Sequence, residues 1–281
     1  MSRPHWLATD LDGTLLPIDG DAEHRDAMKE LSAALEENGI PIVFVTGRSF
    51  AQVQDAVREH APPRPRAVIC DVGTTIMLPT DPTPEDASDT RDEALENFGL
   101  SDDYHRHLQH RLGDWDHERL LSAALDLDLE LTPQPDHQQS ELKTSFFYPP
   151  ELRRSVADTI EQWIRRESVP VSMTISVDPF EGQGLLDLLP RGAQKGSALA
   201  WYLERCGVRA DEVVFAGDTG NDAAAMTSGV RGILVGNADE QLRQAAATVS
   251  GGGASGSAGI YQATGTATAG VWEGFRYHWR M

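Results

Sequence analysis

The stretch Trp6-Leu7-Ala8-Thr9-Asp10-Leu11-Asp12-Gly13-Thr14 joins a short apolar run directly to two carboxylates, a glycine and a hydroxyl. The apolar run predicts a buried strand over residues 6–9. Two carboxylates one residue apart are poor core material, because an ionised side chain loses its hydration on burial. They are well suited to holding a divalent cation and to attacking a phosphorus atom. An acidic turn could carry the same residues, so the rest of the chain decides between the two interpretations.

The first quarter of the chain alternates apolar strands with amphipathic helices. The spacing of apolar residues predicts strands over residues 6–9, 40–45 and 67–70 and helices over 23–38 and 50–60. The near-continuous apolar run over 40–45 is typical of a parallel strand that is buried on both faces. This alternation predicts an α/β fold with a doubly wound, mostly parallel, Rossmann-like core.

The middle of the chain has a different composition and order of elements. Residues 79–92 are rich in Pro, Asp and Thr, which predicts a polar linker. Strands are expected over 142–148 and 171–177, and helices over 103–112, 117–125 and 150–167. The α/β pattern returns with helices over 195–206 and 221–228 and strands over 213–216 and 232–235. We therefore expect a catalytic core formed by residues 1–80 and 186–281, with an α+β cap inserted at 81–185.

The end of the chain combines a Gly/Ser-rich stretch with an aromatic one. Residues 250–257 predict a mobile loop, and residues 271–277 predict a short helix that docks on the core.

Charge and cysteine content restrict the class of partner. The 44 acidic against 24 basic residues give a net charge of −20, which repels nucleic acid and anionic membranes. A phosphate ester would be repelled as well, so a phosphate site needs a metal and local cations. The acid excess is explained by solubility or by adaptation to a salty cytoplasm. Cys70 and Cys206 form no metal or redox motif, and no apolar stretch has the length of a membrane span or a secretory signal, so a cytoplasmic protein is expected.

Three further motifs follow in order. They are Thr46-Gly47-Arg48, Gln194-Lys195-Gly196 and Gly217-Asp218-Thr219-Gly220-Asn221-Asp222. Taken singly, each has an ordinary structural interpretation: a helix cap with a structural ion pair at Arg48, an exposed surface lysine, and a calcium-binding or helix-capping turn. Lys195 opens a helix, where the macrodipole disfavours a cation, and this misfit favours a functional role.

The four motifs in this order resemble the haloacid dehalogenase superfamily of aspartate-nucleophile phosphohydrolases, over almost the whole chain. The resemblance implies that Asp10 is the nucleophile and that Asp12 is a general acid and base, which requires a protonated Asp12 with a raised pKa at attack. It also implies a Mg²⁺ ion. The expected metal-site residues are Asp10, Asp12 through its backbone carbonyl, Asp218 and Asp222, with Asp222 acting through a water or Lys195. The expected phosphoryl contacts are Thr46, Gly47, Arg48, Lys195 and Asn221, with Thr46 and Lys195 also counted as catalytic.

Within that superfamily the chain resembles sucrose-phosphate phosphatase and its relatives, which have a second-position α+β cap. The segments that carry this likeness are 45–49, 142–146, 187–190 with 195–196, 216–222 and 269–271. The likeness implies that Lys143 of the cap contacts the sugar; a solvent-facing lysine on an edge strand is the alternative. Segment 71–76 departs from the family by having threonine in place of an acidic residue.

The expected activity is Mg²⁺-dependent hydrolysis of sucrose 6-phosphate by a monomer, with a sucrose-phosphate synthase-like enzyme as a candidate partner. Mannosyl-glycerate, glucosyl-glycerate and trehalose phosphates are alternative substrates, since the same core releases phosphate from them in related enzymes. A phosphosugar mutase of the phosphomannomutase type is a second class, and a non-catalytic binding module is a third.

Overall fold

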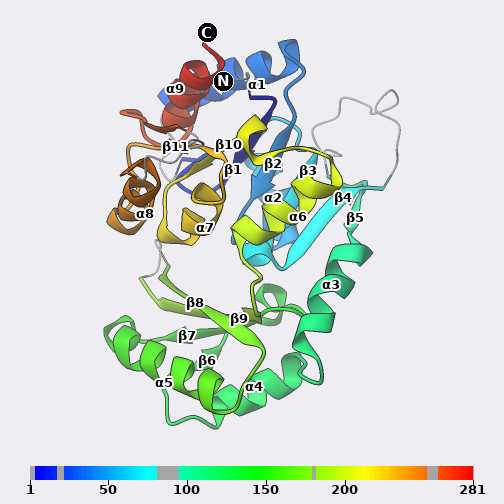
Figure 1. Cartoon of the computed structure of the whole chain (residues 1–281), viewed down its shortest axis with the longest axis vertical. Helices are drawn as coiled ribbons and strands as arrows, with labels where there is room; N and C mark the ends of the chain where they lie inside the picture. The colour runs from blue at the N-terminus through cyan, green and yellow to red at the C-terminus, as the bar shows by residue number, and fades with distance from the viewer. Residues whose placement is uncertain (1–3, 18–21, 81–94, 179–181, 252–258, 281) are drawn as a thin grey trace. The chain divides into compact units, whose positions relative to one another are not determined.

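The structure is a computed structural model that describes residues 4–17, 22–80, 95–178, 182–251 and 259–280. The chain divides into two compact units, a larger one of residues 1–100 and 195–281 and a smaller one of residues 101–194 (Figure 1). These bounds differ from the expected ones of 80/81 and 185/186. The physical reason is strand pairing: β5 (Phe98–Leu100) joins the sheet of the larger unit, whereas β9 (Gly184–Pro190) joins that of the smaller one.

Within the described residues, the larger unit contains an eight-stranded sheet in the order β12-β11-β10-β1-β2-β3-β4-β5. All pairs from β12 to β3 are parallel, and β4 and β5 are added antiparallel at one edge. The remaining strands are β1 (Trp6–Thr9), β2 (Ile42–Val45), β3 (Ala67–Cys70), β4 (Thr75–Pro79), β10 (Val213–Gly217), β11 (Arg231–Leu234) and β12 (Ile260–Gln262). The expected doubly wound, mostly parallel α/β core is confirmed.

Helices of the larger unit bury the apolar side chains of this sheet. They are α1 (Ala22–Glu37), α2 (Phe50–His60), α6 (Lys195–Arg205), α7 (Ala223–Met226), α8 (Glu240–Gly251) and α9 (Ala267–Trp279). Leu7 and Phe44 on one face of the sheet pack with α1, α2 and α9 in a single apolar cluster. Ala8, Val43 and Phe215, at the alternating positions of β1, β2 and β10, are completely buried as well. Helix α6 packs against β3, and helix α7 packs against β10.

The smaller unit is an α+β arrangement. Among its described residues, four antiparallel strands lie in the order β6-β7-β9-β8, with β6 at Thr132–Pro133, β7 at Thr144–Tyr148 and β8 at Val171–Val177. Its helices are α3 (Asp102–Leu112), α4 (His117–Leu125) and α5 (Arg153–Arg166). Val156, Ile160 and Trp163 form the buried stripe of α5, as their helical spacing predicts.

Several expected elements differ in their ends. The strand expected over 40–45 begins at Ile42, because the Ile40 N–H closes the end of α1 by donating to the Leu35 carbonyl. The helix expected over 221–228 is a 3₁₀ turn at Gly220–Asp222 followed by α7. The docking helix expected over 271–277 is longer and forms α9. Most of the expected linker and of the Gly/Ser loop lies outside the described residues.

In the part of the chain that the structure describes, no helix combines the length and the apolarity that a membrane span requires.

Candidate active site

The candidate active site lies where three neighbouring parallel strands end. Asp10 directly follows β1, Thr46 follows β2 and Asp218 follows β10, and the three strands are adjacent in the sheet. The carboxyl ends of parallel strands are where open α/β sheets bind ligands. All three side chains are buried, with exposed fractions of 5%, 0% and 6%. Residues that are far apart in the sequence therefore share one edge of the sheet.

Lys195 is the buried cation of this site. Its Nζ lies 2.9 Å from Asp10 Oδ1 and 2.8 Å from Asp222 Oδ1, and it donates a hydrogen bond of 3.0 Å to Asn221 Oδ1. Burial acts to lower the pKa of Lys195, but the charges of Asp10 and Asp222 outweigh it and raise the pKa above its ordinary value. The ammonium is therefore held charged, and the alternative of an exposed surface lysine is wrong.

Three buried carboxylates surround that single ammonium. Asp10, Asp218 and Asp222 each offer an oxygen atom, and these atoms lie within 4.8 Å of one another. Burial raises the pKa of Asp10 well above its ordinary value although Lys195 opposes it, and burial together with Asp222 raises the pKa of Asp218 to about 7. Three carboxylates near one cation leave an excess of negative charge, which a divalent cation with oxygen ligands would neutralise. The donor set therefore fits Mg²⁺.

The three acids are not equivalent. Asp222 Oδ1 binds Lys195, and its Oδ2 accepts hydrogen bonds from the backbone N–H groups of Asp218 and Thr219 at 3.1 and 3.2 Å. Asp222 therefore shapes the turn after β10 and orients the lysine. Asp218 Oδ1 accepts the Thr14 hydroxyl at 2.9 Å, which ties the turn after β10 to the turn after β1.

The close approach of the turn after β1 to Asp218 requires a glycine at position 13. Its φ is +71°, and an added Cβ would collide with the Asp218 carboxylate. Only glycine combines this left-handed backbone with the absence of a side chain at no steric cost. The glycine of the first motif thus serves the approach of two loops.

Asp12 lies apart from the three clustered acids. Its carboxylate forms a two-pronged ion pair with Arg48, with Nε 2.8 Å from Oδ2 and Nη2 2.5 Å from Oδ1. Both side chains are about one third exposed, at 34% for Asp12 and 28% for Arg48. Arg48 therefore forms the ion pair that was one interpretation of its motif, and its partner is Asp12, the second aspartate of the first motif.

The Thr46-Gly47-Arg48 turn is not the cap of α2. Ser49 caps that helix: its hydroxyl accepts the Gln52 N–H while the Gln52 side chain accepts the Ser49 N–H. Thr46 Oγ1 instead accepts the backbone N–H of Arg48 at 3.1 Å. The turn therefore lies between the end of β2 and the cap, on the sheet edge that carries Asp10.

Two polar residues that the sequence motifs did not single out complete the site. Asn237 Nδ2 donates to the Gly13 carbonyl and its Oδ1 accepts the Ala267 N–H, both at 2.8 Å. Asp239 Oδ2 accepts the Gly220 N–H at 2.9 Å. The sequence could have indicated them by their position, because both follow β11, the parallel strand next to β10 in the sheet.

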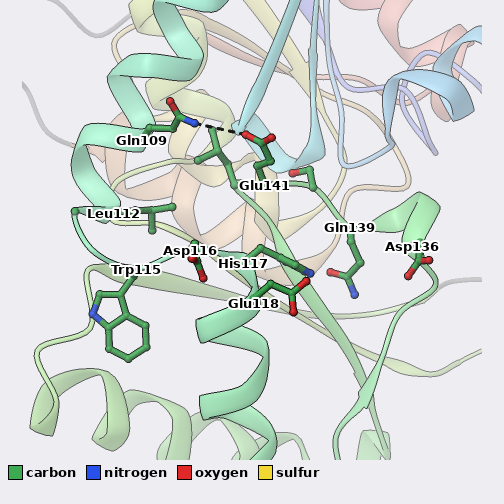
Figure 2. Close-up of a pocket in the computed structure, with 12 residues that line it drawn as sticks. Gln109, Leu112, Trp115, Asp116, His117, Glu118, Asp136, Gln139 and Glu141 are labelled. Carbon is green, nitrogen blue, oxygen red and sulfur yellow. Dashed lines mark hydrogen bonds between the residues drawn. The ribbon is translucent and has the colours of Figure 1, made fainter.

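A separate concave site lies entirely within the smaller unit. It is a cavity of about 680 Å³ whose lining includes Gln109, Trp115, Asp116, His117, Gln139 and Glu141. Figure 2 shows these side chains on α3, at the start of α4 and on the segment before β7, with Gln109 hydrogen-bonded to Glu141. An aromatic ring beside amides and carboxylates offers both apolar and hydrogen-bonding surface.

Lys143 comes directly after the last lining residue, Leu142. Its exposed fraction is 6%, so the solvent-facing alternative is wrong. Its backbone N–H and carbonyl pair with Ser140, which fixes the segment that lines the cavity.

The parallel sheet and the acids around Lys195 define a haloacid dehalogenase-like hydrolase. Two solved structures share this fold over nearly the whole chain. The sucrose-phosphatase of Synechocystis sp. PCC6803 in complex with sucrose and phosphate has a TM-score of 0.75 and 23% identity, and covers 99% of this chain and 98% of that one. A haloacid dehalogenase-like hydrolase of Bacillus subtilis has a TM-score of 0.63 and 20% identity, over 98% and 93%. The chain belongs to the sucrose-6F-phosphate phosphohydrolase family, whose model matches residues 3–280.

Curated relatives are similar over most of this chain. A HAD-like hydrolase of Nitrosococcus oceani is 34% identical over 88% of this chain and 62% of its own length. The mannosylfructose-phosphate phosphatase of Agrobacterium fabrum is 28% identical, over 84% of each protein. Sucrose-phosphatase 2 of Nicotiana tabacum is 28% identical over 85% of this chain but only 51% of its own length. The chain thus spans between half and five sixths of these relatives.

Proposed function

We propose that this protein is a Mg²⁺-dependent phosphatase that hydrolyses a sugar phosphate monoester, with sucrose 6-phosphate as its preferred substrate. The observation that carries the proposal is the buried contact of Lys195 with Asp10 at 2.9 Å, beside two further acids at the end of the parallel sheet. A structural ion pair does not need this surplus of carboxylates, whereas a phosphoryl-transfer site does. Membership of the sucrose-6F-phosphate phosphohydrolase family supports the choice of substrate.

In the first half-reaction, an Asp10 carboxylate oxygen attacks phosphorus and forms an aspartyl-phosphate. The bond from phosphorus to the sugar oxygen breaks, and that oxygen takes a proton from Asp12. Lys195, the Thr46 hydroxyl and the backbone N–H of Gly47 are the proposed donors to the phosphoryl oxygens. Positioned donors of this kind stabilise the charge that develops in transfer.

In the second half-reaction, water attacks the same phosphorus while Asp12 takes its proton. The bond between Asp10 and phosphorus breaks, so inorganic phosphate leaves and Asp12 carries the proton needed for the next cycle. Each proton transfer by a positioned carboxyl group contributes roughly 10²- to 10⁴-fold.

Mg²⁺ would be held by the Asp10 and Asp218 side chains and the Asp12 backbone carbonyl, with Asp222 orienting its surroundings. When bound, it neutralises charge on the phosphoryl oxygens. Asn221 supports the site by accepting a hydrogen bond from Lys195.

The cavity of the smaller unit is a proposed sugar-binding site. Trp115, one ring face of which carries the Arg119 guanidinium at 4.2 Å, offers its remaining surface to a sugar, and Gln109 and Glu141 can hydrogen-bond hydroxyl groups. The Gln139 amide instead holds the segment before β7, because it bonds the backbone of Gln134 and Ser145. Lys143 fixes the neighbouring segment. Relatives that act on mannosylfructose phosphate or make glucosylglycerol phosphate keep other compatible-solute esters as alternative substrates.

The deciding experiment measures phosphate release with Mg²⁺ from a panel of esters. The panel holds sucrose 6-phosphate, mannosylfructose phosphate, trehalose 6-phosphate, glycosyl-glycerate phosphates and hexose monophosphates. A strong preference for sucrose 6-phosphate supports the proposal, and a preference for another disaccharide ester corrects the substrate. Transfer that requires a sugar bisphosphate activator would instead identify a mutase.

A variant pair tests the nucleophile. Asp10→Asn should abolish turnover with an unchanged circular dichroism spectrum, whereas Asp55→Asn, on the exposed face of α2, should behave as wild type. Substantial turnover by Asp10→Asn would remove Asp10 from the role.

A further inference from the structure

Arg48 is engaged with Asp12 through most of its donor groups. Nε and Nη2 contact both carboxylate oxygens of Asp12, and Nη1 donates to the Gln52 carbonyl at 3.2 Å. The hydrogen bonds to Asp12 raise the pKa of Arg48. A planar guanidinium that meets a carboxylate through two parallel bonds fixes the plane of that carboxylate, which a lysine at the same point would not do.

The backbone of Arg48 is held independently of Asp12. Its N–H donates to Thr46 Oγ1 at 3.1 Å, and its carbonyl accepts the Asp71 N–H at 2.9 Å. Asp71 and Val72 have φ values of +51° and +59°, a left-handed conformation that non-glycine residues keep only where the surrounding structure holds it. The Val72 N–H donates to the Thr46 carbonyl, so both residues of this turn hydrogen-bond the Thr46-Gly47-Arg48 segment. The guanidinium therefore extends from a rigid base.

We propose that Arg48 is a positioning residue for Asp12 and does not serve mainly to bind the substrate phosphate. This inference rests on the proposed function. An ionised carboxylate has about four lone-pair sites, and the bonds from Arg48 occupy the side that faces the guanidinium. One of the remaining sites carries the proton that passes to the leaving sugar oxygen in the first half-reaction, and the same site, then ionised, accepts a proton from water in the second. Without Arg48 the Asp12 side chain is free to rotate, and both proton transfers lose their geometry.

The test is a double-mutant cycle on turnover. Arg48→Ala should lower kcat for the preferred sugar phosphate by about 10- to 100-fold, part of what a positioned acid and base supplies, and should change KM by less than about 3-fold. In an Asp12→Ala background the same change should lower kcat by less than about 3-fold, because the group that it positions is already gone. Arg48→Lys, which keeps the charge but loses the fork, should restore only a small part of kcat.

The choice of leaving group adds a readout that a purely structural role would not affect. The leaving group of 4-nitrophenyl phosphate needs little protonation. Arg48→Ala should therefore slow single-turnover phosphorylation of Asp10 by 4-nitrophenyl phosphate much less than it slows phosphorylation by the sugar ester. The matched control is Arg58→Ala on α2, which removes an exposed pair with Asp55 at 2.7 Å and should leave both substrates unaffected.

Three outcomes would overturn this role. If the kcat losses of Arg48→Ala and Asp12→Ala multiply in the double variant, the two residues act independently. If Arg48→Ala raises KM and leaves kcat unchanged, Arg48 is a substrate contact. Wild-type protein that releases no phosphate from any ester overturns the proposed function and this role together, whereas active wild type with multiplying effects overturns only the role. If an alanine variant unfolds, Arg48→Lys and Asp12→Asn complete the same cycle.

Discussion

Lys195 Nζ lies 2.9 Å from Asp10 Oδ1 in a site where the lysine side chain is completely buried. Two charges taken out of water are tolerated because each compensates the other. Asp222 contacts the same ammonium at 2.8 Å, so one lysine balances two carboxylates. The lysine is thus an integral part of the folded core as well as of the proposed reaction.

Lys195→Ala should therefore impair stability as well as activity. Removing one partner of a buried pair costs roughly 3–5 kcal/mol, because a charge is left without compensation. We expect the thermal unfolding midpoint to fall, phosphate release to be lost, and added Mg²⁺ to recover part of the midpoint. Lys29→Ala removes an exposed pair with Asp26 and serves as the control. An unchanged midpoint in Lys195→Ala would contradict the compensation argument.

Mg²⁺ binding should weaken as the pH falls through neutrality. Burial and Asp222 raise the pKa of Asp218 to about 7, so at lower pH a proton must leave before a cation can bind. Titration calorimetry at pH 8, 7 and 6 should show falling affinity with a growing release of protons. Asp218→Asn should lose most of the affinity at every pH. Affinity that is independent of pH would exclude Asp218 as a ligand.

The sequence predicted those parts of the fold in which local pattern and tertiary structure agree. Helix α2 and strands β3 and β8 have the expected ends, because each is a regular apolar pattern bounded by turn or capping residues. Strand β9 was missed, since its run Leu185-Leu186-Asp187-Leu188-Leu189 lacks both alternation and helical spacing. Asp187 is buried there because its Oδ1 accepts the Ser145 hydroxyl at 2.6 Å on the neighbouring strand, a partner that local pattern does not reveal.

In the candidate site, too, the sequence predicted some residues and missed others whose roles depend on tertiary contacts. The resemblance carried by the motif order predicted that Asp10, Lys195 and Asp218 belong to one site. Asp10 and Asp218 follow adjacent parallel strands, whose carboxyl ends meet, and Lys195 begins α6. The partner of Arg48 was not predicted, because the pair joins residues 36 positions apart through side-chain rotamers. Asn237 was missed because its role depends on a bridge from Gly13 to the start of α9.

Gly196 should be intolerant of a side chain, which explains why a glycine follows the motif lysine. An added Cβ would lie 2.5 Å from the Ala224 backbone, so Gly196 permits the close approach of α6 and α7. Gly196→Ala should destabilise the protein by about 1–3 kcal/mol through overpacking and lower kcat by displacing Lys195. Gly259→Ala, which meets nothing within 4 Å, is the matched control. Equal denaturant midpoints for both variants would contradict this packing argument.

His278 should make folding stability depend on pH below about 6.5. The imidazole is buried in α9 and its Nε2 lies 3.0 Å from the Gly232 carbonyl oxygen. Burial lowers the pKa of His278, so as the pH falls the unfolded chain, with a pKa near 6.5, takes up the proton before the folded protein does. The free energy of unfolding should therefore be unaffected well above about pH 6.5 and should decrease as the pH falls from there towards the lower pKa of the folded protein. Denaturant titrations from pH 8 to 5 measure this slope, which His278→Gln should reduce and His110→Gln, at an exposed position on α3, should leave unchanged. An equal slope in wild type and His278→Gln would assign the pH dependence to other groups.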